Sequence, residues 1–384
     1  MFFEYLRPLD ADFVKEIEGF PEACLGKKIV LHTNDAFPDL TKVKLAILGV
    51  LDNRGDLMNY DDAPKLDSFR SNFYRFYPGN WEFSIADLGD LPQGETQEDT
   101  YFALSSIVSD LVKSRIVPII IGGSQDLTYS IYRAFDGLEQ MVNLVSIDSK
   151  FDIGKQDDLH NNESYLSKII TNAPHNLYNF SNIGYQTFFN SQEEIDLLEK
   201  MHFDVYRLGE IVNDIAIAEP ILRDADIVSL DVNAIKSSVT GNVKKFQPNG
   251  FDGVEVCKLA RYAGISDKVS VFGIFNLCHE PNESVILSEI IWYFIEGYHQ
   301  RSNEYPFVSK SQYTKYHVLV DDIEILFYKS KKTGRWWMDT SNDKGLNNNL
   351  NNSSLLSCTE DDYLKACDQE IPERWWRSAK KQIM

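Results

Sequence analysis

The sequence predicts an α/β fold built on a mostly parallel sheet. Two observations carry this prediction. Eight short runs rich in Val, Ile and Phe recur along the chain, most of them bounded by Gly, Asp or Asn. Segments with apolar residues at helical spacing lie between several of these runs. Strands that alternate with helices form parallel sheets whose two faces the helices cover. An eight-stranded barrel has the same strand count, and periodicity alone leaves it open.

The elements of the main domain follow in order after residues 1–42, which show no clear pattern. The expected strands cover residues 43–50, 83–88, 116–121, 142–148, 177–185, 203–208, 226–232 and 269–275. Between them, Thr96 and Asp99 resemble a capping box, and apolar residues at helical spacing follow from Leu104 to Val112. The segment from Ser191 to Met201 is a second expected helix.

The character of the chain changes after Tyr298, so we predict a main domain at 1–300 and a C-terminal extension at 301–384. The extension holds two strand-like runs, Tyr316–Val320 and Ile323–Tyr328. A polar, Asn-rich stretch at 341–354 has the composition of a loop or linker. An amphipathic segment, Asp361 to Lys381, closes the chain.

The extension carries the tripeptide Arg-Trp-Trp twice. The residues are Arg335, Trp336, Trp337, Arg374, Trp375 and Trp376. We favour the interpretation that these tryptophans pack the extension against the main domain. The alternative is an interface with a protein partner, because Trp and Arg are enriched at binding hot spots.

Composition excludes several classes of function. The formal net charge of −20 argues against nucleic acid and against anionic membrane surfaces, both of which need clustered Lys and Arg. The five cysteines show no CxxC spacing, which fits a reducing compartment rather than a disulfide framework. The first residues do not resemble a signal peptide, and the most apolar helix candidate, Val285–Ile295, is too short to span a bilayer. We therefore expect a cytoplasmic protein without membrane insertion.

Polar clusters follow two successive strands of the chain, at the edge where open α/β sheets bind ligands. After the strand at 116–121 the chain reads Gly122-Gly123-Ser124-Gln125-Asp126. After the strand at 142–148 it reads Asp148-Ser149-Lys150-Phe151-Asp152.

These two clusters and two later blocks resemble the motifs of the ureohydrolases (arginases, agmatinases and formimidoylglutamases). The later blocks are Ser229-Leu230-Asp231-Val232-Asn233 and Ile274-Phe275-Asn276-Leu277, and Asp62-Ala63-Pro64 with Phe69-Arg70 resembles an upstream family segment. The four blocks keep the family order, and the resemblance covers roughly residues 40–300. It implies a three-layer α/β/α fold with an eight-stranded, mostly parallel sheet, which decides against the barrel.

The resemblance also implies a site for two manganese ions, held in the family by two His and four Asp. Here those positions hold Gln125, Asp148, Lys150, Asp152, Asp231 and Asn233. Three carboxylates remain and both imidazoles are replaced. The family's substrate-facing Glu falls on Ile274, and a later Asp falls on Lys236.

A protonated lysine has no lone pair, so Lys150 cannot be a metal ligand. We therefore expect no metal, and a cleft in which Lys150, with Lys236, balances Asp148, Asp152 and Asp231. The Lys150 ammonium should then lie within roughly 4 Å of one of these carboxylates. His160 matches an acid–base histidine of arginases only weakly, and we expect a surface-loop histidine there.

The loss of both His ligands favours a non-catalytic ureohydrolase homologue that acts as a binding or scaffold protein, through the extension or as a homo-oligomer. One alternative is a metal-dependent hydrolase of linear amidines, similar to formimidoylglutamases, with manganese at Asp148, Asp152 and Asp231. Another is a small-molecule sensor that uses the same cleft.

Overall fold

The main sheet has nine strands, all parallel, within the residues that the computed structural model describes: 2–57, 66–138, 140–154, 160–304, 310–340 and 355–381. Their order across the sheet is β1-β3-β2-β4-β9-β8-β5-β6-β7. The strands are β1 (Val30–Leu31), β2 (Val43–Leu51), β3 (Ser84–Pro92), β4 (Val117–Ile121), β5 (Val142–Ile147), β6 (Leu177–Tyr185), β7 (Asp204–Arg207), β8 (Ile227–Asp231) and β9 (Val271–Phe275).

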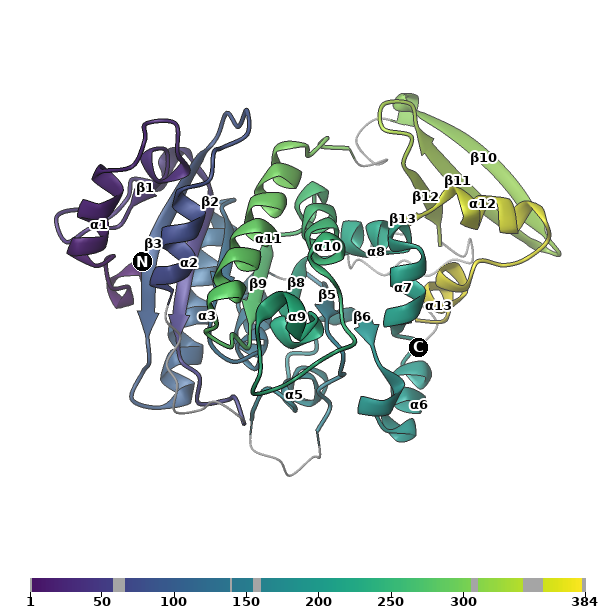
Figure 1. The fold of residues 1–384 in the computed structure, drawn as a ribbon. Helices are drawn as coiled ribbons and strands as arrows, with labels where there is room; N and C mark the ends of the chain where they lie inside the picture. The colour runs from purple at the N-terminus through teal and green to yellow at the C-terminus, as the bar shows by residue number, and fades with distance from the viewer. Residues whose placement is uncertain are drawn as a thin grey trace.

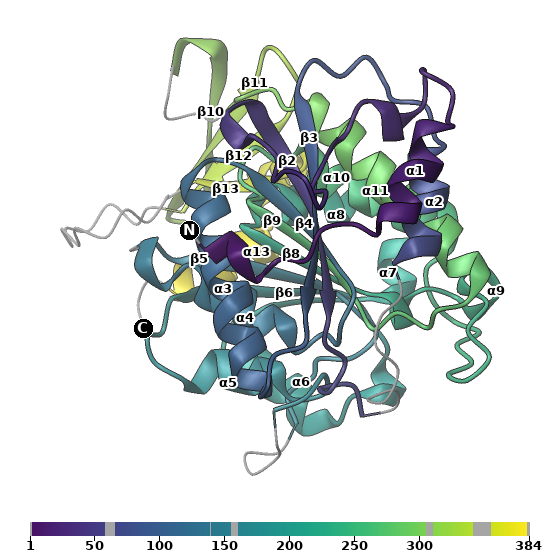
Figure 2. The same cartoon turned by 90° about the vertical axis from the view of Figure 1, so that its left-hand side faces the viewer.

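Helices cover both faces of this sheet (Figures 1 and 2). One apolar cluster joins a face of the sheet to α1 (Ala11–Glu18), α2 (Asp67–Tyr74), α7 (Leu208–Asn213), α8 (Ala218–Asp224), α10 (Gly253–Ile265) and α11 (Pro281–His299). A second cluster joins the other face to α3 (Gln97–Lys113), α4 (Leu127–Arg133), α5 (Tyr165–Thr171) and α6 (Gln192–Lys200). Alternate strand residues point to opposite faces, so Ile119 and Ile121 enter one cluster and Ile120 the other. The molecule is therefore a three-layer α/β/α structure.

The eight predicted strands are all present, and the barrel alternative is wrong because the sheet is open, with β1 and β7 at its edges. The ninth strand, β1, pairs only two residues with β3, too few to give a signal of alternation in the sequence. The predicted capping box is confirmed. The Thr96 side chain accepts a hydrogen bond from the Asp99 N–H, and the Asp99 carboxylate accepts one from the Thr96 N–H.

The extension forms a four-stranded antiparallel sheet with two helices beside it (Figure 1). Its elements are β10 (Tyr313–Val320), β11 (Ile323–Ser330), β12 (Trp336–Asp339), β13 (Leu355–Cys358), α12 (Glu360–Cys367) and α13 (Glu373–Lys381). The expected single segment from Asp361 to Lys381 is thus two helices. Pro372 explains the break, because proline disfavours helical geometry at the residue before it.

Two predicted features lie outside the described residues: Asp62-Ala63-Pro64 and the Asn-rich stretch at 341–354. The division at residue 300 stays a prediction. Among the helices that are described, none is long and apolar enough to cross a membrane.

Candidate functional site

The polar residues singled out by the sequence gather at the carboxyl ends of four adjacent strands, β4, β9, β8 and β5. Gln125 follows β4, Asp148 and Asp152 follow β5, and Asp231 is the last residue of β8. Asn276 follows directly after β9. Because parallel strands end at one edge of the sheet, residues far apart in the sequence form one buried group of side chains, here called the strand-end cleft.

The double glycine shapes the turn that brings Gln125 into this cleft. Gly122 and Gly123 have φ angles of 93° and 74°, in the left-handed region that favours glycine. A Cβ on Gly123 would lie 2.7 Å from the backbone oxygen of Asp52, which is too close for any side chain. The turn therefore requires glycine for both its dihedral angle and its close packing.

The three carboxyl groups of the cleft are buried, and all three have raised pKa values. Burial, followed by the charge of Asp148, raises the pKa of Asp231 to about 7. Burial and the charge of Asp148 raise the pKa of Asp152 well above its ordinary value. Asp152 also hydrogen-bonds with Asp148. A proton on Asp152 that is donated to Asp148 accounts for this pair.

Gln125 is fully buried, and its amide is committed to neighbouring groups. Its Nε2 donates to the Ser146 and Tyr165 hydroxyl oxygens at 3.3 and 3.4 Å. Its Oε1 accepts from Asn276 Nδ2 at 3.3 Å, and Asn276 Oδ1 accepts the Gln125 backbone N–H at 3.0 Å. Asn276 was not among the predicted site residues, although its position directly after a buried strand could have identified it.

Lys150 does not take the position that its sequence context predicted. Its ammonium lies 2.6 Å from Oε1 of Glu163, and no carboxylate of the strand-end cleft comes within 4.0 Å of it in the described structure. Burial opposes the charge of Lys150, but the hydrogen bond and charge of Glu163 leave its pKa above the ordinary value. The expected contact with Asp148, Asp152 or Asp231 is therefore wrong. Glu163 stands 13 residues away, and nothing in the sequence marked it as the partner.

The second expected cation, Lys236, also turns elsewhere. Its Nζ lies 4.0 Å from Asp252 Oδ2. The positive charge that lowers the pKa of both Asp148 and Asp231 comes from Lys245, which no sequence signal identified. Asn233 does contribute, because its backbone N–H and its Nδ2 donate to Asp231 Oδ1 at 2.8 and 2.9 Å.

His160 is buried rather than exposed, so the expected surface-loop position is wrong. Its ring packs edge-on against Tyr101 and Tyr129, with both centroid distances at 5.0 Å. Burial lowers the pKa of His160 to about 3, so the imidazole is neutral near pH 7.

These residues do not fit a two-manganese centre. Mn²⁺ favours carboxylate, carbonyl and imidazole ligands. The Gln125 carbonyl oxygen already accepts from Asn276, and an ammonium group stands at position 150. Across the part of the chain that is described, no group of three or more His, Cys, Asp or Glu side chains has a geometry that could hold a metal ion.

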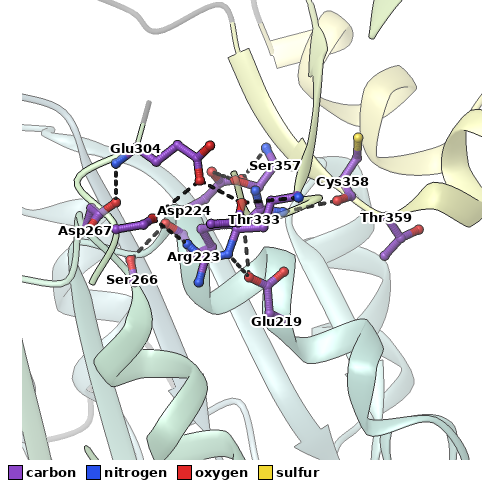
Figure 3. Close-up of polar contacts among 12 residues, drawn as sticks. Glu219, Arg223, Asp224, Ser266, Asp267, Glu304, Thr333, Ser357, Cys358 and Thr359 are labelled. Carbon is purple, nitrogen blue, oxygen red and sulfur yellow. Dashed lines mark hydrogen bonds and ion pairs between the residues drawn. The ribbon is translucent and has the colours of Figure 1, made fainter. Parts of the chain in front are cut away.

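The residues of the two Arg-Trp-Trp tripeptides make mainly intramolecular contacts. Trp336, Trp337 and Trp375 are buried. Figure 3 shows Arg223 and Asp224 of α8 among polar groups of the extension, where Asp224 accepts from the N–H and hydroxyl of Ser357 at 3.0 and 2.6 Å.

The two arginines of these tripeptides complete the same interface. Arg374 Nη2 lies 3.3 Å from Asp224 Oδ2, and Arg335 Nε lies 3.4 Å from Glu219 Oε1. The guanidinium of Arg223 stacks over Trp337, 4.5 Å from the ring centroid. Both tryptophans of the first tripeptide are therefore buried. By contrast, Trp376 is 44% exposed.

The chain is similar to known proteins in its sequence profile and in its fold. Residues 67–275 match the sequence profile of the arginase family. Formiminoglutamase from Trypanosoma cruzi, solved with Mn²⁺, superposes with a TM-score of 0.61 at 18% identity, over 67% of this chain and 94% of that one. Formimidoylglutamase from Bacillus subtilis gives 0.60 at 16% identity, over 70% and 91%. Agmatine ureohydrolase from Thermoplasma volcanium gives 0.58 at 18% identity, over 74% and 97%. No curated protein sequence matches significantly. At such identities the structures establish an arginase-like fold.

Proposed function

This chain belongs to the arginase family, and we propose that it is a non-catalytic member that acts as a binding or scaffold protein. The observation that carries the proposal concerns the two positions at which the family has histidine ligands. Gln125 is hydrogen-bonded into the core, and Lys150 is paired with Glu163 outside the carboxylate cluster. The Lys150 ammonium has no lone pair to offer a metal ion, and the Gln125 carbonyl oxygen already accepts a hydrogen bond from Asn276.

Protonation supports the same proposal, because a protonated carboxyl group is neutral and can stay buried without a metal cation beside it. Buried charges are costly unless they are paired, and a buried carboxyl group commonly takes up a proton instead. Asp148 and Asp152 hydrogen-bond to each other, and Asp231 has a pKa of about 7. Asn233, Asn276 and Lys245 supply further stabilisation to these groups.

Metal analysis tests the proposal directly. The full chain is incubated with Mn²⁺, desalted, and its metal content is measured by mass spectrometry. We expect the chain to retain far fewer than one Mn²⁺ ion per molecule. The double variant Gln125→His with Lys150→His is the matched control, because it restores both imidazoles and should retain more Mn²⁺. Stoichiometric Mn²⁺ in the unmodified chain would contradict the proposal.

A second candidate is a manganese-dependent hydrolase of linear amidines, similar to formimidoylglutamases. The observation in its favour is that Asp148, Asp152 and Asp231 remain together at one cleft. Turnover of formimidoylglutamate, arginine or agmatine with added Mn²⁺, lost in Asp231→Asn, would support the hydrolase. Inactivity towards all three compounds would exclude it. A sensor role for the same cleft would instead show as a rise in melting temperature with a guanidino or amidino compound, without turnover.

A protein partner on the extension would have to use what the intramolecular contacts leave exposed. That surface includes Trp376, which packs against His202 and under Lys380. If the extension recruits a partner, Trp376→Ala should lower its capture from native cell extract, while Phe102→Ala, an exposed aromatic on α3, should not. Equal capture by both variants would argue against this surface. A cytoplasmic location and homo-oligomerisation are further parts of the proposal, testable by fractionation and by light scattering.

A further inference from the structure

A second cavity lies at the edge of the sheet opposite the strand-end cleft, between the amino ends of β5, β6, β7 and β8 and the extension. Its volume is about 480 Å³, within the range of about 300–1,000 Å³ typical of small-molecule sites. The extension forms one wall, and its helix α13 (labelled in Figure 1) bonds to Asn179 of β6 and to the backbone oxygen of Phe203, just before β7. The cavity therefore exists only because the extension is docked.

Two cationic side chains of α13 line the cavity. These side chains are Lys381 and Arg374, and Arg377 lies on the same helix. The Lys381 ammonium donates to Asn179 Oδ1, and within the described structure it forms no ion pair with a carboxylate. Arg374 Nε has no hydrogen-bond partner among the described residues. Burial lowers the pKa of Lys381 to about 8, which an anion beside it would reverse.

The lining also offers acceptors. Asn143 Oδ1 is buried and lacks a hydrogen-bond partner in the described part of the chain, while its Nδ2 donates to the backbone oxygen of Asp224 at 2.9 Å. Asp226, which is 7% exposed, also lines the cavity, and one of its oxygens accepts the Asn143 N–H at 2.8 Å. A buried acceptor without a donor costs free energy, so this part of the lining suits a ligand that donates hydrogen bonds.

We propose that this cavity binds a small zwitterion of the amino-acid class. Its carboxylate would meet Lys381 and Arg374, and its ammonium group would meet Asn143 Oδ1 and Asp226. The side chain of the ligand would lie against Leu355, Leu356 and Ile221, which supply the apolar part of the lining.

The charge balance of the lining selects this class over simpler ions. Three carboxylates and three cations line the cavity: Asp204, Asp224, Asp226, Lys268, Arg374 and Lys381. A dianion such as phosphate would meet the carboxylates, and a cation would meet the Lys and Arg side chains. A molecule with both charges, held apart, avoids both conflicts.

The proposal goes beyond the proposed function and does not depend on it. Asp226 precedes β8, whereas Asp231 ends it, so the two sites lie at opposite ends of the same strand. A ligand here could bind whether or not the strand-end cleft is catalytic.

The experiment is a thermal-shift screen of the full chain against the standard free L-amino acids at up to about 10 mM, since a ligand that binds only the native state raises the melting temperature. Each amino acid that gives a shift is then titrated by calorimetry. Its carboxamide, which lacks the carboxylate, and its N-acetyl derivative, which lacks the ammonium group, are the paired probes. We expect both derivatives to bind more weakly.

Variants locate the site. Lys381→Met and Asp226→Asn should each weaken binding roughly tenfold to hundredfold, as expected for the loss of a hydrogen bond to a charged group. Lys380→Met, one residue away and directed at Trp376, should bind normally, as should Asp148→Asn in the strand-end cleft. Circular dichroism checks that each variant is folded. A screen without any shift, unchanged binding by Lys381→Met, or binding lost only in Asp148→Asn would overturn the proposal.

Discussion

The ammonium of Lys150 lies 2.6 Å from the carboxylate of Glu163, and it forms no ion pair with Asp148, Asp152 or Asp231 in the described structure. Both partners are partly exposed, with side-chain exposures of 30% and 43%. The pair therefore belongs to the rim of the strand-end cleft. The buried carboxyl groups are therefore stabilised by protons, by amides and by the charge of Lys245, while Lys150 acts on Asp152 only through its charge, without an ion pair.

Removing Lys150 should consequently cost little stability. A partly exposed ion pair contributes about 0–1 kcal/mol, so Lys150→Met should lower the free energy of unfolding by no more than about 1 kcal/mol. Urea denaturation monitored by fluorescence gives this value. A loss of about 3 kcal/mol or more would mean that Lys150 does balance a buried carboxylate.

Stability should fall as the pH rises from acid values to neutrality. Asp231 has a pKa of about 7 in the folded chain and an ordinary value of 3.8, so between these values the folded state holds a proton that the unfolded state has released. Its contribution is fully present below about pH 4 and is lost as the pH passes 7, with a slope of up to about 1.4 kcal/mol per pH unit.

Urea denaturation between pH 5 and pH 8 measures this slope. Asp231→Asn, which cannot titrate, should reduce it, whereas Asp361→Asn on the exposed side of α12 should leave it unchanged. Equal slopes in the unmodified chain and Asp231→Asn would show that Asp231 is already ionised in the folded state.

The contact between α8 and the extension should be strongly stabilising. Asp224 accepts hydrogen bonds from Ser357 and pairs with Arg374, and all these groups are largely buried. Asp224→Ala should cost about 3 kcal/mol or more, because it leaves a buried guanidinium without its partner. Calorimetric unfolding measures the loss. Asp361→Ala, which removes only an exposed pair with Lys365, should cost about 0.5 kcal/mol or less.

Gly123 should tolerate no side chain. Gly123→Ala would combine a φ of 74° with a contact of 2.7 Å to the backbone oxygen of Asp52, and a cost of about 2–4 kcal/mol is expected. Gly137→Ala is the matched control, since nothing lies within 4 Å of the added Cβ and the residue has an ordinary φ. Similar melting temperatures for the two variants would contradict this account of the turn.

The sequence by itself determined the sheet and the composition of the strand-end cleft. Its eight predicted strands are present because period and local propensity are local properties, and residues after adjacent parallel strands must meet at one edge. Only the tertiary structure decided which partners the side chains contact. Lys150 pairs with Glu163, 13 residues away, and His160 is buried between two tyrosines.

The tertiary structure also decided what the extension does. Ser357 and Arg374 meet Asp224, which lies more than 130 residues earlier in the chain, and the cavity beside them is lined from both parts of the molecule. Such contacts depend on how whole layers pack, so no period, cap or motif in the sequence encodes them. The sequence could predict which chemical groups this protein carries, but their pairing required the three-dimensional arrangement.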